Sequence, residues 1–196
     1  FVGGRDTPNS IHQDGRNNFH RTFQEDHGTL RAQCRVVTEC PSCGGEVDVR
    51  FEPDLNSVFH DCQNDACDVD ELPLYVTDHD IYRNVPSVLL GTLDKISITG
   101  ANPRFTNLLG NFTDKCPKHG LGYAGKCPES STLDCDRELE PVEETLYDPI
   151  PSLHLVDEVH MLNEELGVFA GQYETLYQEL CRQASPDNHE PKVLTS

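Results

Sequence analysis

The sequence predicts an α/β fold in which two cysteine-bearing segments interrupt a parallel sheet. Short apolar runs at residues 85–91 and 153–156 are typical of strands buried in such a sheet. Apolar side chains at helical spacing follow Asn163 and continue to Leu180, which predicts an amphipathic helix. Seven of the nine cysteines gather in two clusters. The strands and the helix indicate the class, and the clusters mark the insertions.

Weaker patterns place the remaining elements. Apolar and polar side chains alternate at residues 47–51, which predicts a half-buried strand, and residues 72–76 are a second strand candidate. Residues 78–83 favour one helical turn. Thr92 follows the glycine that closes the first apolar run, and its hydroxyl can cap a helix directed toward Ile98.

The chain begins at Phe1 rather than Met, inside the end of a predicted strand, so we expect further residues before it. The segments that we assign are a polar N-terminal segment at 1–33, a cysteine module at 34–71, a strand–helix segment at 72–99, a second cysteine-bearing segment at 100–149, a strand and helix at 150–185, and a tail at 186–196 that we expect to fray.

The net charge is −19, from 34 acidic and 15 basic residues. Such a surface repels nucleic-acid phosphates at low salt. Lysine is scarce and the acidic residues are spread along the chain, a pattern that also fits a halophilic protein of a salt-rich cytoplasm. An ordinary acidic domain remains the alternative. No apolar run approaches the ~20 residues of a membrane-spanning helix, so we expect no membrane contact.

The first cluster pairs Cys40 and Cys43 with Cys62 and Cys67. A two-residue gap lets both thiolates of a knuckle face one ion, and four thiolates complete the tetrahedron that zinc prefers. The cluster therefore predicts a structural zinc ribbon in a reducing cytoplasm rather than a disulfide-rich secreted domain. Four unrelated buried cysteines are the alternative, and Cys34 could compete with Cys40 as a ligand.

The second cluster contains Cys116 and His119 in a similar knuckle, followed by Cys127 and Cys135. These four side chains could bind a second structural zinc ion. The last two are eight residues apart, a looser spacing than in a standard knuckle, so a reduced loop without metal remains open.

Asp157 and Glu158 directly follow the apolar run at 153–156. The carboxyl ends of parallel strands form the edge where open α/β sheets bind ligands. Phosphate hydrolysis needs a Mg²⁺ anchor and a group that orients or deprotonates water, and two adjacent carboxylates can supply both. An exposed acidic strand end is the alternative.

Together with Val159 and His160, these acids resemble the Asp-Glu-x-His box, motif II, of superfamily 2 helicases. The resemblance implies a RecA-like parallel sheet. It also implies that Asp157 holds Mg²⁺ through water, that Glu158 activates the attacking water, and that His160 couples the nucleotide to other motifs.

Upstream, residues 88–95 resemble motif Ib, the strand–Gly–Thr–helix segment with which such motors contact a nucleic-acid strand. This resemblance implies that Gly91, Thr92 and Lys95 contact nucleic acid.

The wider pattern of residues 34–180 resembles the large helicases found with DISARM-type phage-defence systems. That resemblance implies an ATP-driven cytoplasmic motor with nucleic acid, DNA in particular, and other defence-system proteins as partners. The chain has no Gly-x-x-x-x-Gly-Lys-Ser/Thr phosphate loop. We therefore expect that loop and the second motor domain elsewhere in a longer protein, and an inactive isolated chain. The rival hypothesis is a non-enzymatic zinc-ribbon adaptor that binds proteins through its acidic surface.

The halophilic interpretation predicts that the melting temperature rises from low salt to molar KCl. An ordinary acidic domain should gain little above ~0.2 M salt, because exposed charges are already well screened there. Thermal unfolding followed by circular dichroism across a KCl series checks the prediction. A melting temperature that stays flat or falls would remove the halophilic interpretation.

Overall fold

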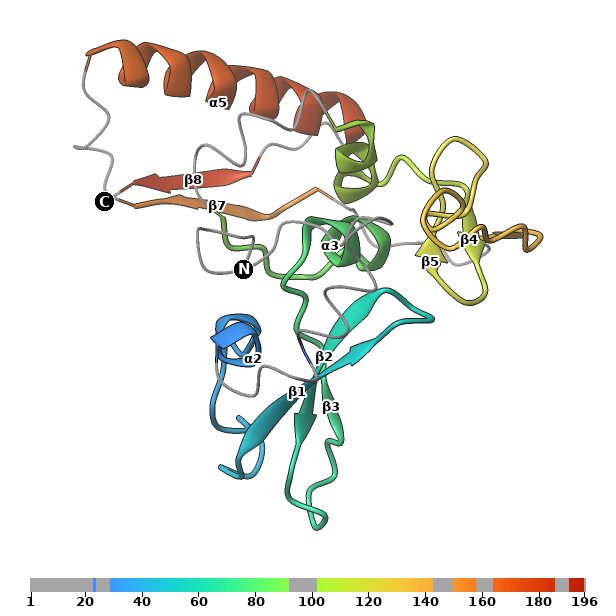
Figure 1. The fold of residues 1–196 in the computed structure, drawn as a ribbon. Coiled ribbons are helices and arrows are strands. Elements are labelled where there is room, and N and C mark those ends of the chain that lie inside the picture. Colours follow the sequence, from blue (N-terminus) through green and yellow to red (C-terminus); the bar gives the residue numbers. More distant parts are fainter. Residues whose placement is uncertain are drawn as a thin grey trace. The chain divides into compact units, whose positions relative to one another are not determined.

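The computed structural model describes residues 23, 29–91, 102–142, 150–157, 164–185 and 191–195. They fall into two compact units, one within Phe1–Thr92 and Asp114–Glu140 and the other within Leu93–Thr113 and Pro141–Ser196. Figure 1 labels the helices and strands of both units. The first unit carries both cysteine clusters, and the second carries the strand that precedes Asp157.

A three-stranded antiparallel sheet forms the centre of the first unit (Figure 1). Its strands, in spatial order, are β1 (Val47–Glu52), β2 (Ser57–Cys62) and β3 (Glu71–Leu72). The alternation predicted at 47–51 is confirmed, because Val47, Val49 and Phe51 are buried while the residues between them are not. The predicted strand at 72–76 is mostly wrong, since only Leu72 of that run joins the ladder.

Apolar side chains on one face of this sheet pack against helix α2 (Thr29–Cys34). The guanidinium of Arg31 on that helix forms an ion pair with Asp48 and donates a 3.0 Å hydrogen bond to the carbonyl of Val49. The core that results contains Phe23, Cys34, Val49, Phe51, Val58 and Val76. It is a small core, so other interactions must contribute to the stability of this unit.

Helix α3 (Asp78–Asn84) confirms the helical turn predicted at 78–83. The Thr77 hydroxyl caps it by accepting a 3.2 Å hydrogen bond from the backbone N–H of Asp80. The helix ends at Val85, which adopts the left-handed conformation with φ 48°. Most of its side chains are buried, including the charged Asp80 and Arg83.

The strand predicted at 85–91 is wrong, because none of these residues is in a strand. Val88 is 83% exposed and Leu90 is also exposed. The left-handed Val85 turns the chain at the end of α3, and Pro86 has no N–H to donate to a ladder. A short apolar run does not by itself identify a buried strand. The helix expected after Thr92 lies outside the described residues.

The second cysteine cluster lies in a turn-rich segment, as the sequence predicts. Its short strands, in spatial order, are β5 (Gly120–Leu121), β4 (Asp114–Cys116) and β6 (Glu140–Pro141). The pairing of β4 with β5 involves only two residue pairs, Lys115 with Leu121 and Cys116 with Gly120. The other side of β4 pairs with β6, and an isolated bridge joins Tyr123 to Lys126, so short pairings and turns hold this segment.

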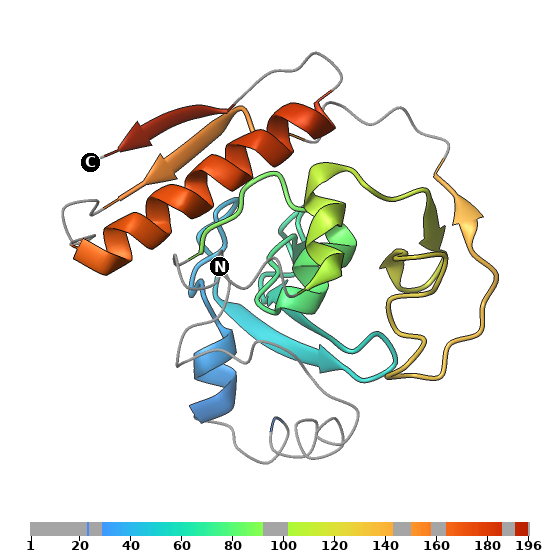
Figure 2. The same cartoon turned by 90° about the horizontal axis from the view of Figure 1, so that it is seen from above.

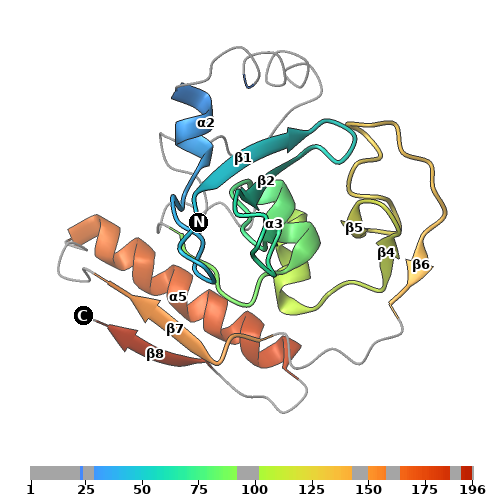
Figure 3. The same cartoon turned by 90° about the horizontal axis from the view of Figure 1, so that it is seen from below.

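The second unit contains η2 (Pro103–Leu109), β7 (Leu153–Val156), α5 (Glu164–Ala184) and β8 (Lys192–Thr195). Strands β7 and β8 are parallel along their full length, and α5 runs alongside them in Figures 2 and 3. The rings of His154 and Tyr177 meet edge to face at 5.4 Å between centroids, which joins the strand to the helix. The predicted strand and the predicted long helix are both confirmed.

Two further predictions for this unit are wrong. Residues 192–195 do not fray but form β8, the parallel partner of β7. Strand β7 is less buried than predicted, since Leu155 is 66% exposed.

A mixed α/β class is confirmed, but within the described segments parallel pairing is confined to β7 and β8, so the RecA-like sheet remains an expectation. No helix in the described part of the chain is long and apolar enough to cross a membrane.

Candidate metal centres

The structure brings all four predicted ligands of the first cluster together. Cys40 and Cys43 lie in the turn before β1, Cys62 ends β2, and Cys67 lies in the turn that follows. The Sγ atoms of Cys40 and Cys67 are 3.9 Å apart, and those of Cys43 and Cys62 are 3.6 Å apart. A Zn–S bond of ~2.3 Å gives a tetrahedron with edges of ~3.8 Å, so these spacings fit one zinc ion.

Two glycines make the first knuckle possible. Gly44 adopts φ +70°, and its N–H closes a 2.8 Å turn onto the carbonyl of Cys40. A Cβ atom at Gly45 would lie 3.1 Å from the Sγ of Cys43 and 2.9 Å from the Cβ of Asn64. Without that Cβ, the Gly45 N–H reaches the Cys43 sulfur at 3.3 Å. The backbone therefore offers hydrogen bonds to a thiolate.

The local environment separates the pKa of Cys43 from that of Cys62. Hydrogen bonds from the Asn64 side chain and the Gly45 N–H lower the pKa of Cys43 to about 6. The Asn64 backbone N–H lowers the pKa of Cys62, but removal from water and hydrogen bonds with neighbouring thiols outweigh it and raise that pKa to about 12. Four adjacent thiolates repel one another strongly, so full ionisation of the cluster needs a bound cation.

The structure also brings the four predicted ligands of the second cluster together. Cys116 ends β4, His119 lies in the turn before β5, and Cys127 and Cys135 come from the turns that follow. The Nδ1 atom of His119 is 3.6 Å from the Sγ of Cys116 and 3.3 Å from the Sγ of Cys127. These spacings fit the edges of a tetrahedral site with three sulfurs and one nitrogen.

The far ring nitrogen of His119 has its own partner. Nε2 lies 3.1 Å from the carbonyl oxygen of Asp54, so it carries the proton and donates to that oxygen. This tautomer leaves Nδ1 as a lone-pair ligand facing the sulfurs, the usual outer-shell arrangement of a metal-binding histidine. Burial also lowers the pKa of His119, which favours the neutral imidazole that a metal needs.

The thiols of this cluster differ in the same way as those of the first. Burial raises the pKa of Cys116, but the N–H groups of Lys118 and His119 outweigh that effect and lower it. Burial raises the pKa of Cys127 to about 12. Both clusters could therefore hold zinc, and because all four positions in each are protein ligands, neither leaves a site for substrate. A structural role is the chemistry that they support.

The two remaining cysteines are not in the metal groups. Cys34 is buried in the apolar core, and burial raises the pKa of its thiol to about 11. It therefore does not compete with Cys40 as a ligand. Cys181 is buried on α5, in the other unit.

The other predicted site residues are only partly described. Asp157 follows β7 directly at the carboxyl end of the parallel pair, where the prediction places it. Gly91 lies in irregular structure. Glu158, His160, Thr92 and Lys95 lie outside the described residues, so their roles remain predictions.

Sequence reasoning missed a buried polar network beside the second cluster. Its central groups are the carboxylate of Glu129 and the guanidinium of Arg83, whose Nη1 and Oε1 atoms are 3.2 Å apart. These residues are 46 positions apart in the chain, so no local pattern could indicate the contact. The position of Glu129 two residues after a metal ligand is the one signal that the sequence offers.

No family model matches the chain. Among curated proteins, it is similar to the "DISARM protein DrmA" of Bacillus paralicheniformis, with 25% identity over 208 aligned residues. The alignment includes all of this chain but only 18% of that protein, so the chain spans about a fifth of the length of its relative. This similarity supports a relationship to DISARM proteins.

Proposed function

We propose that this chain is part of an ATP-driven, helicase-like motor that acts in defence against phage DNA. The observation that carries the proposal is the similarity to a DISARM protein along the whole chain. The relative is much longer, which suits a motor whose phosphate loop and second domain lie in other segments. The partners that we propose are DNA and other defence-system proteins, in the cytoplasm.

The β7–α5–β8 unit supports the motor proposal. Two parallel strands joined through a helix form the basic unit of nucleotide-binding α/β sheets. Asp157 stands at the carboxyl edge of this pair, where ligands of such sheets bind. In the proposed motor Asp157 anchors Mg²⁺ through water, Glu158 takes a proton from the attacking water, and His160 couples the site to other motifs. Gly91, Thr92 and Lys95 contact DNA.

Two structural zinc ions complete the proposal. Each cluster presents four ligand atoms within 4.8 Å of one another, from seven cysteines and one histidine in all. Thiolates and imidazole are the ligands that zinc prefers in such sites. Each ion would connect turns that come from separate parts of the chain, so its binding free energy would contribute directly to folding.

Protein purified without added metal should contain close to two zinc ions per chain. Cys43→Ser should reduce the content to about one and loosen the turns of the first cluster, because a structural zinc site contributes folding free energy. Cys34→Ala is the matched control, since Cys34 is a buried cysteine outside both clusters. Elemental analysis checks the content, and less than half an equivalent in the unmodified chain would contradict the assignment.

Glu158→Gln in the full-length protein should still permit ATP binding but reduce turnover by ~10²-fold or more, because glutamine cannot accept the proton of the attacking water. Asp157→Ala should weaken Mg·ATP binding as well. Steady-state ATPase with DNA present checks both variants. The matched control is Glu174→Gln on α5, which changes the same charge away from the strand end. Equal rates for Glu158→Gln and wild type would leave Asp157 and Glu158 as an acidic strand end and favour the adaptor.

A further inference from the structure

The carboxylate of Glu129 is completely buried and surrounded by polar partners. It forms an ion pair with His79, lies 3.2 Å from the Nη1 of Arg83 and accepts a 3.3 Å hydrogen bond from the Nδ2 of Asn56. Its backbone N–H points at the Sγ of Cys127, 3.4 Å away. One residue thus contacts a predicted metal ligand, helix α3 and the turn between β1 and β2.

Arg83 extends these contacts to the β1–β2 turn and to the start of β2. Its Nη2 atom donates a 2.9 Å hydrogen bond to the carbonyl of Leu55 and a further bond to the hydroxyl of Ser57. Its Nε atom is 3.1 Å from Oδ1 of Asp80, on the same helix. Glu129 is therefore the group through which the second metal loop binds a guanidinium that already joins α3 to the β1–β2 turn.

The histidine knuckle contacts the same two elements. The Nε2 of His119 donates to the carbonyl of Asp54 in the β1–β2 turn. Gly120 adopts φ +83°, and a Cβ atom there would lie 2.7 Å from the carbonyl oxygen of Arg83. The metal loop therefore lies directly against the last turn of α3, closer than any other residue would permit.

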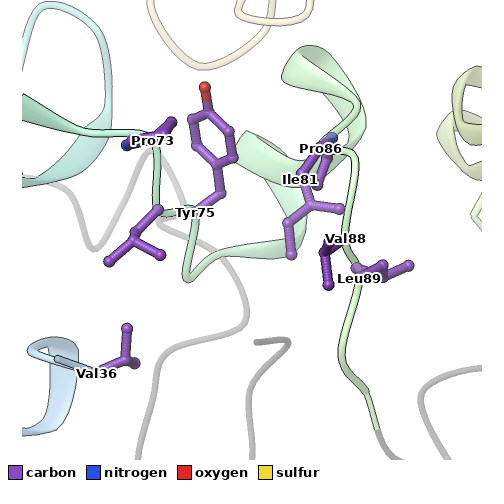
Figure 4. A pocket seen from close by; sticks show the side chains of 8 residues that line it. Val36, Pro73, Tyr75, Ile81, Pro86, Val88 and Leu89 are labelled. Carbon is purple, nitrogen blue, oxygen red and sulfur yellow. The ribbon is translucent and has the colours of Figure 1, made fainter. Parts of the chain in front are cut away.

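The irregular segment 85–91 leaves the end of α3. Val85 donates a 2.9 Å hydrogen bond to the carbonyl of Ile81, so the helix sets where the segment begins. Figure 4 shows Pro86, Val88 and Leu89 beside Ile81, around an apolar cavity of about 60 Å³. The end of this segment is Gly91, one of the residues predicted to contact nucleic acid.

A bound metal ion can hold the loop at residues 116–135 against α3. The segment from Cys116 to Cys135 has the two-pair β4–β5 ladder, an isolated bridge between Tyr123 and Lys126, and otherwise turns and irregular structure, so conformational entropy favours its opening. The charged network does not replace the metal, because burying its charges costs desolvation that pairing only partly offsets. If the loop opened, the Arg83 guanidinium would lose the carboxylate of Glu129, which connects it to the loop, and would keep its ion pair with Asp80.

We infer that the second metal centre is a clamp that reinforces the attachment of α3, and with it the start of segment 85–91, to the β1–β2 turn, and that Glu129 is the positioning residue that joins the metal loop to the helix. The clamp adds to the direct hydrogen bonds of Asn56 and Ser57 with α3. This inference rests on the proposed zinc assignment. The position of segment 85–91, which ends at the predicted nucleic-acid contact Gly91, would then depend on the second metal ion. The first metal centre has no corresponding contact with α3 among the interactions of the described residues.

Hydrogen exchange of the zinc-loaded chain tests the clamp. Cys127→Ser should release one zinc and raise amide exchange in α3, in the turn at residues 53–57 and in segment 85–91. Cys43→Ser should also release one zinc, but raise exchange only around residues 40–47 and 62–72. Zinc content measured on the same samples separates loss of metal from loss of coupling.

Glu129→Gln keeps the backbone N–H that faces Cys127 but removes the charge that pairs with Arg83. It should keep both zinc ions at saturating metal but release the second to a competing chelator about tenfold faster or more, because loss of a buried charge pair loosens the loop. It should also shift the visible absorption of a cobalt-substituted second centre, which a merely structural residue would not affect. The matched control Glu138→Gln removes an exposed carboxylate of the same segment and should change neither quantity.

Two results would overturn the inference. A full second zinc in wild type, together with unchanged α3 exchange in Cys127→Ser, would remove the clamp and leave the zinc assignment intact. A wild-type chain with no zinc at the second centre would remove both the clamp and that part of the proposed function. If Glu129→Gln does not fold, the comparison of Cys127→Ser with Cys43→Ser by hydrogen exchange still decides whether the second centre is the clamp.

Discussion

The convergence of seven thiols and one imidazole into two four-ligand clusters is the constraint on which the first unit depends. Its apolar core is small, and the strands that carry Cys62 and Cys116 end in turns. Cys40 and Val47 are buried together with Leu72, so the first cluster continues the core of the sheet. The sulfurs therefore occupy positions that apolar side chains fill in a larger domain.

The second cluster has a wider structural reach than the first. Through His119, Gly120 and Glu129 it contacts both the β1–β2 turn and α3. The second cluster therefore does more than connect its own turns, because it also contacts two other elements of the unit. These contacts also explain why two acidic and two basic or imidazole side chains can be buried at one place, since each of these charges is compensated by a neighbour. Removing the loop would leave that compensation incomplete.

Sequence patterns predicted the features that depend on interactions between residues close together in the chain. The cysteine knuckles, the alternation at 47–51 and the helical spacing of α5 all reflect rules that operate over a few residues. Residues 85–91 match the composition of a buried strand, yet no neighbouring strand pairs with them in the described residues. Strand β8 has only two apolar residues, Val193 and Leu194, between polar ends, so its pairing with β7 is what identifies it. The Glu129–Arg83 contact joins distant segments and has no local signature.

The atoms that surround each proposed zinc ion decide whether the two clusters are the zinc sites. X-ray absorption at the zinc edge of the zinc-loaded chain measures that directly. We predict four sulfurs at one ion and three sulfurs with one imidazole nitrogen at the other, at Zn–S distances of ~2.3 Å. Cys127→Ser should leave a spectrum of sulfur ligands alone, from the first centre. A first shell dominated by oxygen or nitrogen in the unmodified chain would contradict the account, because the clusters would then not be the zinc sites.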